Sequence, residues 1–249
     1  MARPRHLLHP PITEALIDIH VAPQRGLTFA GLNEAIGALQ FGYYVKSPIS
    51  EGFFGFKLTP DGQQPEATSQ SAQTGLRLHS LDEKYVVQCR LRGFTLSRLP
   101  PYEDWDSLVE ETRRVWTVYT DVLAPTRVTR VATRFINNLQ LPMQPGDSYQ
   151  TYLHKLVDVP DGAPQAVASF FQRFQLVDAE SSATVNLTLA LEESSPSGRV
   201  PVILDVDAFM PADLAPTDRR LWEFLGRLRQ LKNRTFFSII TEQAAGLYE

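Results

Sequence analysis

The first regular pattern along the chain is an alternation of apolar and polar residues at positions 12–21. Glu14, Asp18 and His20 share one side of the pattern, and the residues on the other side are mostly apolar. Successive side chains of a strand point to opposite faces, so this period of two predicts a strand with one buried face. Residues 1–11, which end in a pair of prolines, are expected to form a flexible arm.

Apolar residues at helical spacing predict three longer helices. The first begins at Thr28, which can cap it, and ends near Gly42. The second is the clearest, because Asp104 can cap it, an apolar stripe follows, and Pro125 stops it. The third spans residues 217–233 and carries a leucine-rich stripe.

The remaining segments are predicted to be strands, short helices or loops. Residues 60–74 are polar and rich in turn formers, so an exposed hairpin tip or loop is expected there. Two short helical segments are expected around 148–158 and 164–174. The expected strands are 43–48, 52–59, 75–80 and 84–99 (these two as a hairpin), 126–141, 174–180, 184–193 and 200–210, with 235–241 as a short strand or extended segment.

The order of these elements indicates an α+β fold, with antiparallel sheet or sheets backed by long helices. Strand, helix, several strands and a long helix occur in this order in residues 12–124 and again in 125–249. We therefore predict two pseudo-repeats, TBP-like or helix-grip-like, that form either one continuous sheet or two packed subdomains. The alternative is a single irregular α+β domain, because no repeat of individual residues is visible.

The charge balance argues against a dedicated nucleic-acid binder. The 249 residues carry a net charge of −4, whereas such proteins usually show a basic excess that neutralises phosphates. The basic residues are mostly arginines, because only five of the 24 are lysines. Arginine offers a rigid fork of donors suited to carboxylate and phosphate groups.

Several kinds of site are not expected from the residue types present. Cys89 is the single cysteine, so the chain can form neither an internal disulfide nor a cysteine-based zinc site, and its apolar neighbours predict a buried side chain. The histidines are scattered, and no nucleotide-binding, hydrolase or metalloprotease motif is present. We therefore expect no cofactor or metal. With no secretion signal and no long apolar run, a cytoplasmic protein without a membrane span is expected.

A row of polar residues on the strand 126–141 is the first candidate site. Arg130, Arg134 and Asn138 lie on its even-numbered side, while Asp205 and Asp207 share one side of the strand 200–210. If the two strands share a sheet, the arginines can form cross-strand ion pairs with the aspartates. Paired carboxylates can equally bind Mg²⁺ or perform acid–base chemistry, and the sequence does not decide between these roles.

Polar faces of the same kind recur on other predicted strands. Glu14 belongs to one of them and Arg92 to another, and Asn137 lies beside the arginine row. Together these faces form either a solvated surface or a concave surface for a protein partner or an anionic ligand. The candidate binding residues are Glu14, Arg92, Arg130, Arg134, Asn137, Asn138, Asp205 and Asp207.

Three segments together resemble a family of sporadically distributed prokaryotic proteins of about this length and of unknown function. Pro11 and Glu14 match its N-terminal Pro-x-x-Glu motif, and Arg134 and Asn137 match its central Arg-aromatic-x-Asn motif, where Phe135 replaces the more usual tyrosine. Residues 202–209 and the C-terminal "RTFFSIIT" resemble the family's last strand and tail. The resemblance implies no catalytic residues, and the patchy distribution implies a defence or toxin–antitoxin context.

Three functions remain open on this evidence. The first is a non-enzymatic binding module that uses the polar sheet face. The second is a metal-dependent nuclease or phosphoesterase that uses Asp205 and Asp207, although a third nearby carboxylate or histidine is lacking. The third is a structural subunit of an oligomeric assembly, with edge strands or Trp222 at the contact.

Overall fold

The computed structural model describes residues 1–249 except 38–40, 58–65, 144–146, 155–161, 165–166 and 192–198, and only the backbone of 53–57 and 66–70. The helices are α1 (Phe29–Gly37), α2 (Trp105–Leu123), α3 (Arg220–Ile239) and α4 (Glu242–Gly246), with a single 3-10 turn at Tyr149–Thr151. The strands are β1 (Ile12–Ala22), β2 (Tyr43–Lys57), β3 (Glu66–Ser80), β4 (Tyr85–Arg90), β5 (Gly93–Arg98), β6 (Arg127–Leu141), β7 (Phe170–Val177), β8 (Thr184–Leu191) and β9 (Val200–Leu214).

All nine of these strands belong to one antiparallel sheet, in the order β2-β3-β4-β5-β1-β6-β9-β8-β7. The expected α+β class is thus confirmed, and the strands of both halves of the chain form one continuous sheet. The pair β1–β6 joins the halves, with ten residue pairs in register from Ile12↔Asn137 to Ala22↔Arg127. No helix in the described part of the chain is long and apolar enough to span a membrane.

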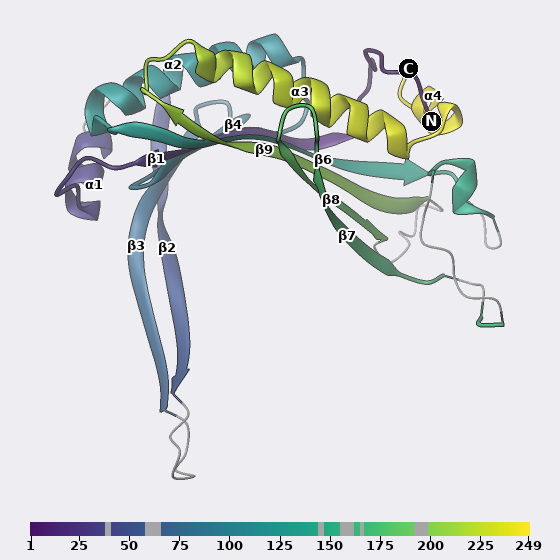
Figure 1. The fold of residues 1–249 in the computed structure, drawn as a ribbon, viewed down its shortest axis with the longest axis horizontal. Coiled ribbons are helices and arrows are strands. Elements are labelled where there is room, and N and C mark those ends of the chain that lie inside the picture. Colours follow the sequence, from purple (N-terminus) through teal and green to yellow (C-terminus); the bar gives the residue numbers. More distant parts are fainter. Residues whose placement is uncertain (38–40, 58–65, 144–146, 155–161, 165–166, 192–198) are drawn as a thin grey trace.

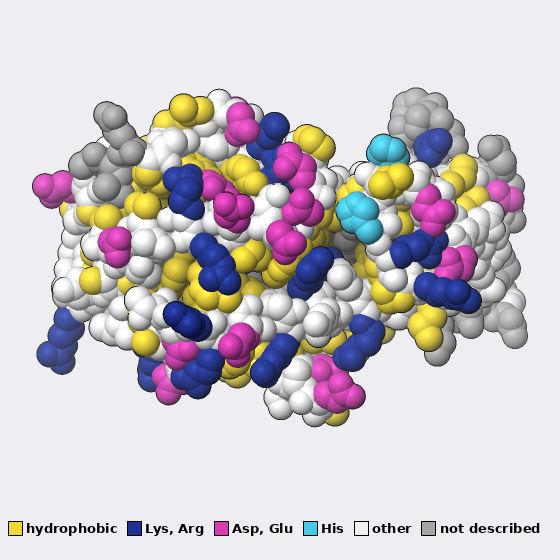
Figure 2. All heavy atoms as spheres, turned by 90° about the horizontal axis from the view of Figure 1, so that it is seen from above, with side chains coloured by type: hydrophobic (Ala, Val, Ile, Leu, Met, Phe, Trp, Pro, Cys, Tyr) yellow, Lys and Arg dark blue, Asp and Glu magenta, His cyan; other side chains and the backbone are white. Residues whose placement is uncertain are grey.

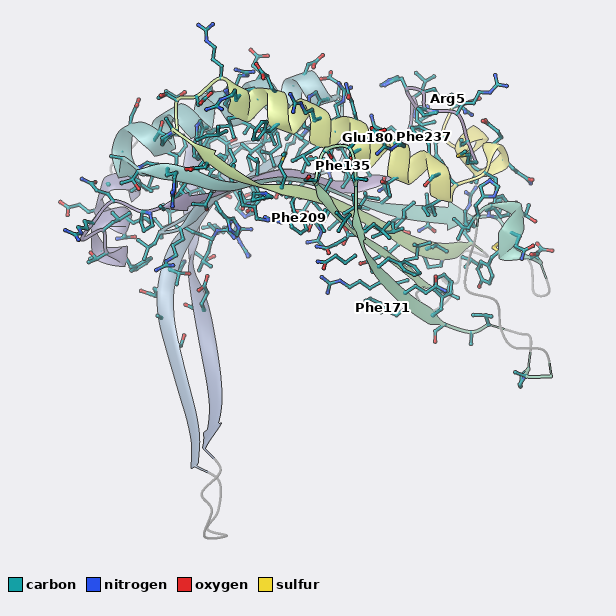
Figure 3. All side chains as sticks on the ribbon, viewed as in Figure 1. Arg5, Phe135, Phe171, Glu180, Phe209 and Phe237 are labelled. Atoms are coloured by element: carbon teal, nitrogen blue, oxygen red, sulfur yellow. The ribbon has the colours of Figure 1, made fainter. Side chains whose placement is uncertain are left out.

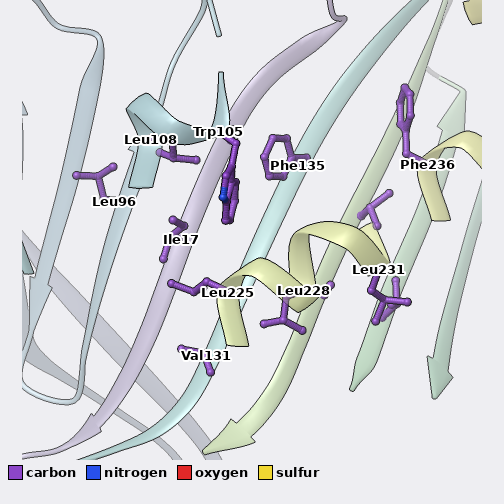
Figure 4. Packing of buried hydrophobic residues seen from close by; sticks show 14 of the residues in the cluster. Ile17, Leu96, Trp105, Leu108, Val131, Phe135, Leu225, Leu228, Leu231 and Phe236 are labelled. Carbon is purple, nitrogen blue, oxygen red and sulfur yellow. The ribbon is translucent and has the colours of Figure 1, made fainter. Parts of the chain in front are cut away.

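The helices α2 and α3 both cover the same face of the sheet (Figure 1). The odd-numbered residues Val131, Phe135 and Leu139 of β6 point into this layer and are buried. Figure 4 shows Phe135 beside Trp105 of α2, and the rings of Phe135 and Trp105 are stacked with 6.4 Å between centroids. Each fully buried side chain of this size contributes about 1.5–3 kcal/mol to stability.

The opposite face of the sheet is concave, and no helix of the described residues covers it (Figure 1). At one end of the sheet β2 and β3 run far beyond their neighbours as a projecting hairpin, and at the other end β8 and β7 curve toward the same side (Figure 1). The two strands of the hairpin pair over their whole length, from Tyr43↔Ser80 to Lys57↔Glu66. The uncovered face is therefore bounded on two sides by strands of the same sheet.

Several strand predictions need correction at their boundaries. The two short strands expected at 43–48 and 52–59 are one strand, β2, because both segments pair with β3. The loop expected at 60–74 is wrong from residue 66 onward, where β3 begins, and residues 60–65 lie outside the described part. The predicted strand 84–99 is itself a hairpin, β4–β5, with its turn after Arg90.

Two further predictions need correction. The helical segment expected at 164–174 is contradicted from Phe170 onward, because β7 pairs there with β8. The short strand or extended segment expected at 235–241 is wrong over 235–239, which belong to α3, whereas Ile240 forms an isolated β-bridge with Leu153. Of the helical segment expected around 148–158, the described residues form only the 3-10 turn.

The N-terminal residues 1–11, expected to be a flexible arm, pack against the C-terminal end of the chain. Ala2 is buried, and its backbone N–H donates to carbonyl oxygens at the end of α3. The Arg5 guanidinium forms ion pairs with Glu242 and Glu249, at 2.8 and 2.6 Å. These contacts hold the arm on the helix-covered side, beside α4 (Figure 1).

The close approach of β3 and β4 at Gly75 yields a test of the sheet. A Cβ added to Gly75 would lie 2.6 Å from the carbonyl oxygen of Cys89, so strands must shift to admit it. We expect Gly75→Ala to lower the free energy of unfolding by about 1–3 kcal/mol in urea denaturation. In Gly226→Ala, the matched control in the middle of α3, the new Cβ meets nothing within 4 Å. The control should gain up to about 1 kcal/mol, and equal effects of both changes would contradict the argument.

Candidate functional site

The concave face of the sheet gathers polar side chains because its strands pair in one consistent register. Asp18 of β1 lies opposite Thr95 of β5 on one side and opposite Ala132 of β6 on the other. His20 lies opposite Arg130 in the same β1–β6 pair. Residues that lie directly opposite each other on paired strands share a face, so the polar sides of β1, β4, β5, β6, β8 and β9 form one surface.

Asp18 is the centre of a hydrogen-bonded cluster on this surface. Its Oδ1 accepts from Arg90 Nη2 at 2.6 Å and from Thr95 Oγ1 at 2.7 Å. Its Oδ2 accepts from Arg130 Nη1 at 2.8 Å and lies 3.0 Å from His20 Nε2. One carboxylate therefore holds two guanidinium groups that come from strands on either side of β1.

The surroundings of Asp18 favour its ionised form. Burial alone would raise the pKa of Asp18, because a buried charge loses its hydration. The hydrogen bond with His20, the positive charge of Arg90 and the hydroxyl of Thr95 outweigh this effect and hold the pKa of Asp18 well below its usual range. The carboxylate therefore stays charged and serves as a fixed anchor for the arginines.

A second ion pair joins β6 and β9. Arg134 lies opposite Asp207 in register, but its guanidinium bonds the next carboxylate along, with Nε–Oδ1 and Nη2–Oδ2 distances to Asp205 of 2.9 and 2.7 Å. This bidentate hydrogen bond with Asp205 raises the pKa of Arg134 above its usual value, although burial acts in the opposite direction. The negative charge of Glu14, on β1, adds a smaller contribution in the same direction.

Asp207 has weaker partners than Asp205. Its Oδ2 accepts from Asn186 Nδ2 of β8 at 3.1 Å and lies 3.9 Å from Arg130 Nη2. Burial raises the pKa of Asp207, with the bond from Asn186 and the nearby arginines acting against this rise. The Arg130 guanidinium also lies 4.4 Å from the centroid of the Phe209 ring, which faces the concave side (Figure 3).

The structure brings together six of the candidate residues and separates two. Arg130, Arg134, Asn138, Glu14, Asp205 and Asp207 share the concave face, and the predicted meeting of the arginines with the aspartates is confirmed. Arg92 lies in the β4–β5 turn with an exposed side chain, so it does not join the cluster. Asn137 points to the helix side, where its Nδ2 donates to the carbonyl oxygens of Phe135 and Leu204.

The alternation in the sequence places Asp18 on a polar strand face, and it places Arg90 on the same strand face as Arg92, but it singles out neither residue. Their meeting depends on the pairing of β1 with β5 and of β5 with β4, which brings together residues 72 positions apart. Thr95 and Phe209 were missed altogether. The only available signal for these residues was the alternation of their strands, which does not reveal which strands are neighbours.

The chemistry of this surface is that of paired charges. Asp18 and Asp205 are bonded to arginines, and Asp207 accepts a hydrogen bond from an asparagine. Within the described residues, no three His, Cys, Asp or Glu side chains are grouped as a metal site requires. The arginines remain partly accessible, with side-chain exposures of 25% for Arg90, 26% for Arg130 and 42% for Arg134.

Removing the charge of Asp18 should destabilise the fold. Asp18→Asn leaves the Arg90 and Arg130 guanidinium groups beside a neutral amide, so we expect the free energy of unfolding to fall by about 2–4 kcal/mol at pH 7. Asp213→Asn is the matched control, because Asp213 pairs with Arg127 at 3.4 Å but is 79% exposed. Urea denaturation should show a loss of less than about 1 kcal/mol for the control.

The effect of Asp18→Asn should depend on pH in one direction. Because the folded-state pKa of Asp18 lies below its ordinary value of 3.8, ionised Asp18 contributes stability that is fully present above that value. This contribution is lost as the pH falls toward the folded-state pKa. The difference between wild type and Asp18→Asn should therefore shrink below about pH 4, and a difference that is constant with pH would contradict the assignment.

Comparison of the chain with models of known protein families and with curated proteins finds no match. The function must therefore be inferred from the geometry of the molecule.

Proposed function

We propose that this chain is a non-enzymatic binding module that holds a protein partner on the concave face of its sheet. The observation that carries the proposal is the surface centred on Asp18, Arg130, Arg134 and Asp205, which is uncovered, concave and held in a fixed arrangement by its own ion pairs. Rigid, partly exposed arginines are favoured at the centre of protein interfaces.

The fixed arrangement of these arginines supports binding because it lowers the cost of ordering. A free arginine side chain loses rotamer freedom when a partner binds, and this loss opposes association. Arg130 and Arg134 already have their guanidinium groups held by Asp18 and Asp205. A partner's carbonyl oxygen, which carries no net charge, can bond their remaining N–H groups without that loss.

Apolar side chains at one margin of the face favour a protein over a small ligand. Phe171 and Val177 of the edge strand β7 are 71% and 74% exposed, and Phe171 lies on the concave side (Figure 3). Exposed aromatic side chains beside a polar surface are typical anchors for protein partners. A small anion fits this face less well, because each central arginine already has a carboxylate partner.

The two rival functions receive less support. A nuclease or phosphoesterase would need Asp205 and Asp207 free to hold a metal, but one pairs with Arg134 and the other with Asn186. A structural subunit of an oligomer would use the outer edges of the sheet, and the exposed residues of β7 are compatible with that role. The experiment below therefore includes the state of assembly.

The proposal extends to context and ancestry. The two halves would be pseudo-repeats, since β1 and β6 begin them, lie paired at the centre and are each flanked by the last strand of their own half, β5 or β9.

A role in prokaryotic defence or a toxin–antitoxin pair rests only on the sequence resemblance. A cytoplasmic location accords with the one cysteine, Cys89, which is buried and whose pKa is raised to about 12 by burial.

The proposal is tested by capturing partners from the native host with immobilised wild-type chain and single variants. We expect one protein partner that binds wild type, and an affinity that falls about tenfold or more in Arg134→Ala, because a central interface arginine contributes on the order of 1–2 kcal/mol. Phe171→Ser should weaken the same partner. Arg220→Ala is the control, because Arg220 is 60% exposed, pairs with Asp218 and lies on the helix side.

Thermal melting of each variant separates lost binding from lost folding, since Arg134→Ala is expected to cost on the order of 1–3 kcal/mol in stability. Capture that is unaffected by both Arg134→Ala and Phe171→Ser would refute the proposed surface. Capture of the chain by itself, with a matching rise in mass by light scattering, would favour the oligomeric subunit instead.

A further inference from the structure

A pocket of about 360 Å³ lies on the helix-covered side of the sheet, away from the concave face. The N-terminal arm forms one wall, the segment before α2 a second, and the C-terminal half of α3 a third, with β6 as the floor. Its lining is rich in aromatic residues, among them Tyr102, Trp105, Phe135 and Phe236. Pockets that hold small molecules start at about this volume, roughly 300 Å³.

Lys232 of α3 contributes an amine to this pocket that has no anionic partner. Its side chain is buried, with 8% exposure, and its Nζ lies 3.5 Å from the centroid of the Phe135 ring. Within the described part of the chain it makes no side-chain hydrogen bond or ion pair. A buried ammonium group without a counter-charge is costly, so such groups are usually paired.

Arg229, one turn earlier on α3, adds a second cation to the same pocket. Its guanidinium lies 5.5 Å from the centroid of the Trp105 ring, and it forms no ion pair with any described residue. Burial, and to a smaller extent the charge of Arg229, lowers the pKa of Lys232 to about 7. The two cations therefore repel each other in a place where no described carboxylate separates them.

The other charged groups that line the pocket are already engaged. Glu103 pairs with Arg98 at 2.8 Å, and Asp104 accepts a hydrogen bond at 2.7 Å from the backbone N–H of Ser107 as the cap of α2. Arg5 is held by Glu242 and Glu249 on the arm side. His6 also lines the pocket. The pocket thus carries two cations without an ion pair among the described residues, the buried Lys232 and the solvent-exposed Arg229.

We propose that this pocket binds a small carboxylate with a planar apolar body. The carboxylate would bond Lys232 Nζ and the Arg229 guanidinium, and the apolar body would pack against the rings of Phe135 and Trp105. A single negative charge matches the site better than a dianionic phosphate, because the aromatic walls offer few additional hydrogen-bond donors. This site is independent of the proposed protein-binding face, which lies across the sheet.

The test measures binding of three aromatic carboxylates and their neutral amides to the whole chain by calorimetry at pH 6.5. The pairs are benzoate with benzamide, phenylacetate with phenylacetamide, and indole-3-acetate with indole-3-acetamide, and inorganic phosphate is a further probe. We expect at least one carboxylate to bind tenfold or more tightly than its amide and than phosphate. This comparison uses the wild-type protein only, so it does not depend on whether a variant folds.

A variant then assigns the preference to the pocket. Lys232→Met keeps the length of the side chain but removes its charge, and it should reduce carboxylate affinity at least tenfold while leaving the amide unchanged. Its melting temperature should equal or exceed that of wild type, because an unpaired buried charge is removed. Arg220→Gln, on the exposed start of α3, is the control and should bind as wild type does.

The proposal is overturned if no probe binds, if acids and amides bind equally, or if phosphate binds more tightly than every carboxylate. It is also overturned if Lys232→Met, shown to be folded by circular dichroism, retains the carboxylate affinity. None of these outcomes bears on capture of a protein by the concave face, since Arg134 and Phe171 do not line the pocket.

Discussion

The pairing of β1 with β6 is the constraint on which the rest of the structure depends. Each of these strands alternates apolar and polar residues, and the antiparallel register between them matches the two patterns, so that Ile17 and Phe135 face the helices while Asp18 and Arg134 face the opposite side. A shift of one residue would reverse every side chain of one strand relative to the other and would turn Asp18 toward the helix-covered side. The hydrophobic layer and the polar layer are therefore specified by the same register.

The parts of this arrangement that are local in sequence could be predicted, and those that depend on distant pairing could not. The period of two marks the polar faces of 12–21, 126–141 and 200–210, and opposite charges on two of them led to the Arg134–Asp205 bond. The contacts of Asp18 span 72 residues to Arg90 and 112 to Arg130, and no local pattern states which strands become neighbours. Arg92 illustrates the same limitation. The alternation of apolar and polar residues continues past Arg92 without a break, so the sequence does not show the turn there, which only the β4–β5 pairing reveals.

The errors in secondary structure have a similar cause, since tertiary packing overrides local preference. The segment at 235–239 is rich in β-branched and aromatic residues, but Phe236 and Phe237 bury their rings against the core as the last turn of α3. Residues 170–173 were predicted as helix, but they begin the edge strand β7, whose second half was predicted as a strand. The side chains of β7 are largely exposed, so the strand lacks a buried face that would mark its start. Pairing with β8 alone determines its conformation.

Adjacent residues of β6 point to opposite faces of the sheet. Their different neighbours explain why the concave face and the helix-side pocket differ in charge. Arg134 points to the concave side, where Asp205 of the neighbouring strand is within reach, whereas Phe135 points to the helix side and meets Lys232. On the sheet, register places a carboxylate beside each central arginine, so the charges balance within the chain. On the helix side, Lys232 and Arg229 come from one turn of α3 and face aromatic rings, which attract cations weakly and cannot neutralise them. Each central arginine of the polar sheet face therefore has a carboxylate partner, whereas Lys232 and Arg229 at the aromatic pocket form no ion pair with any described residue.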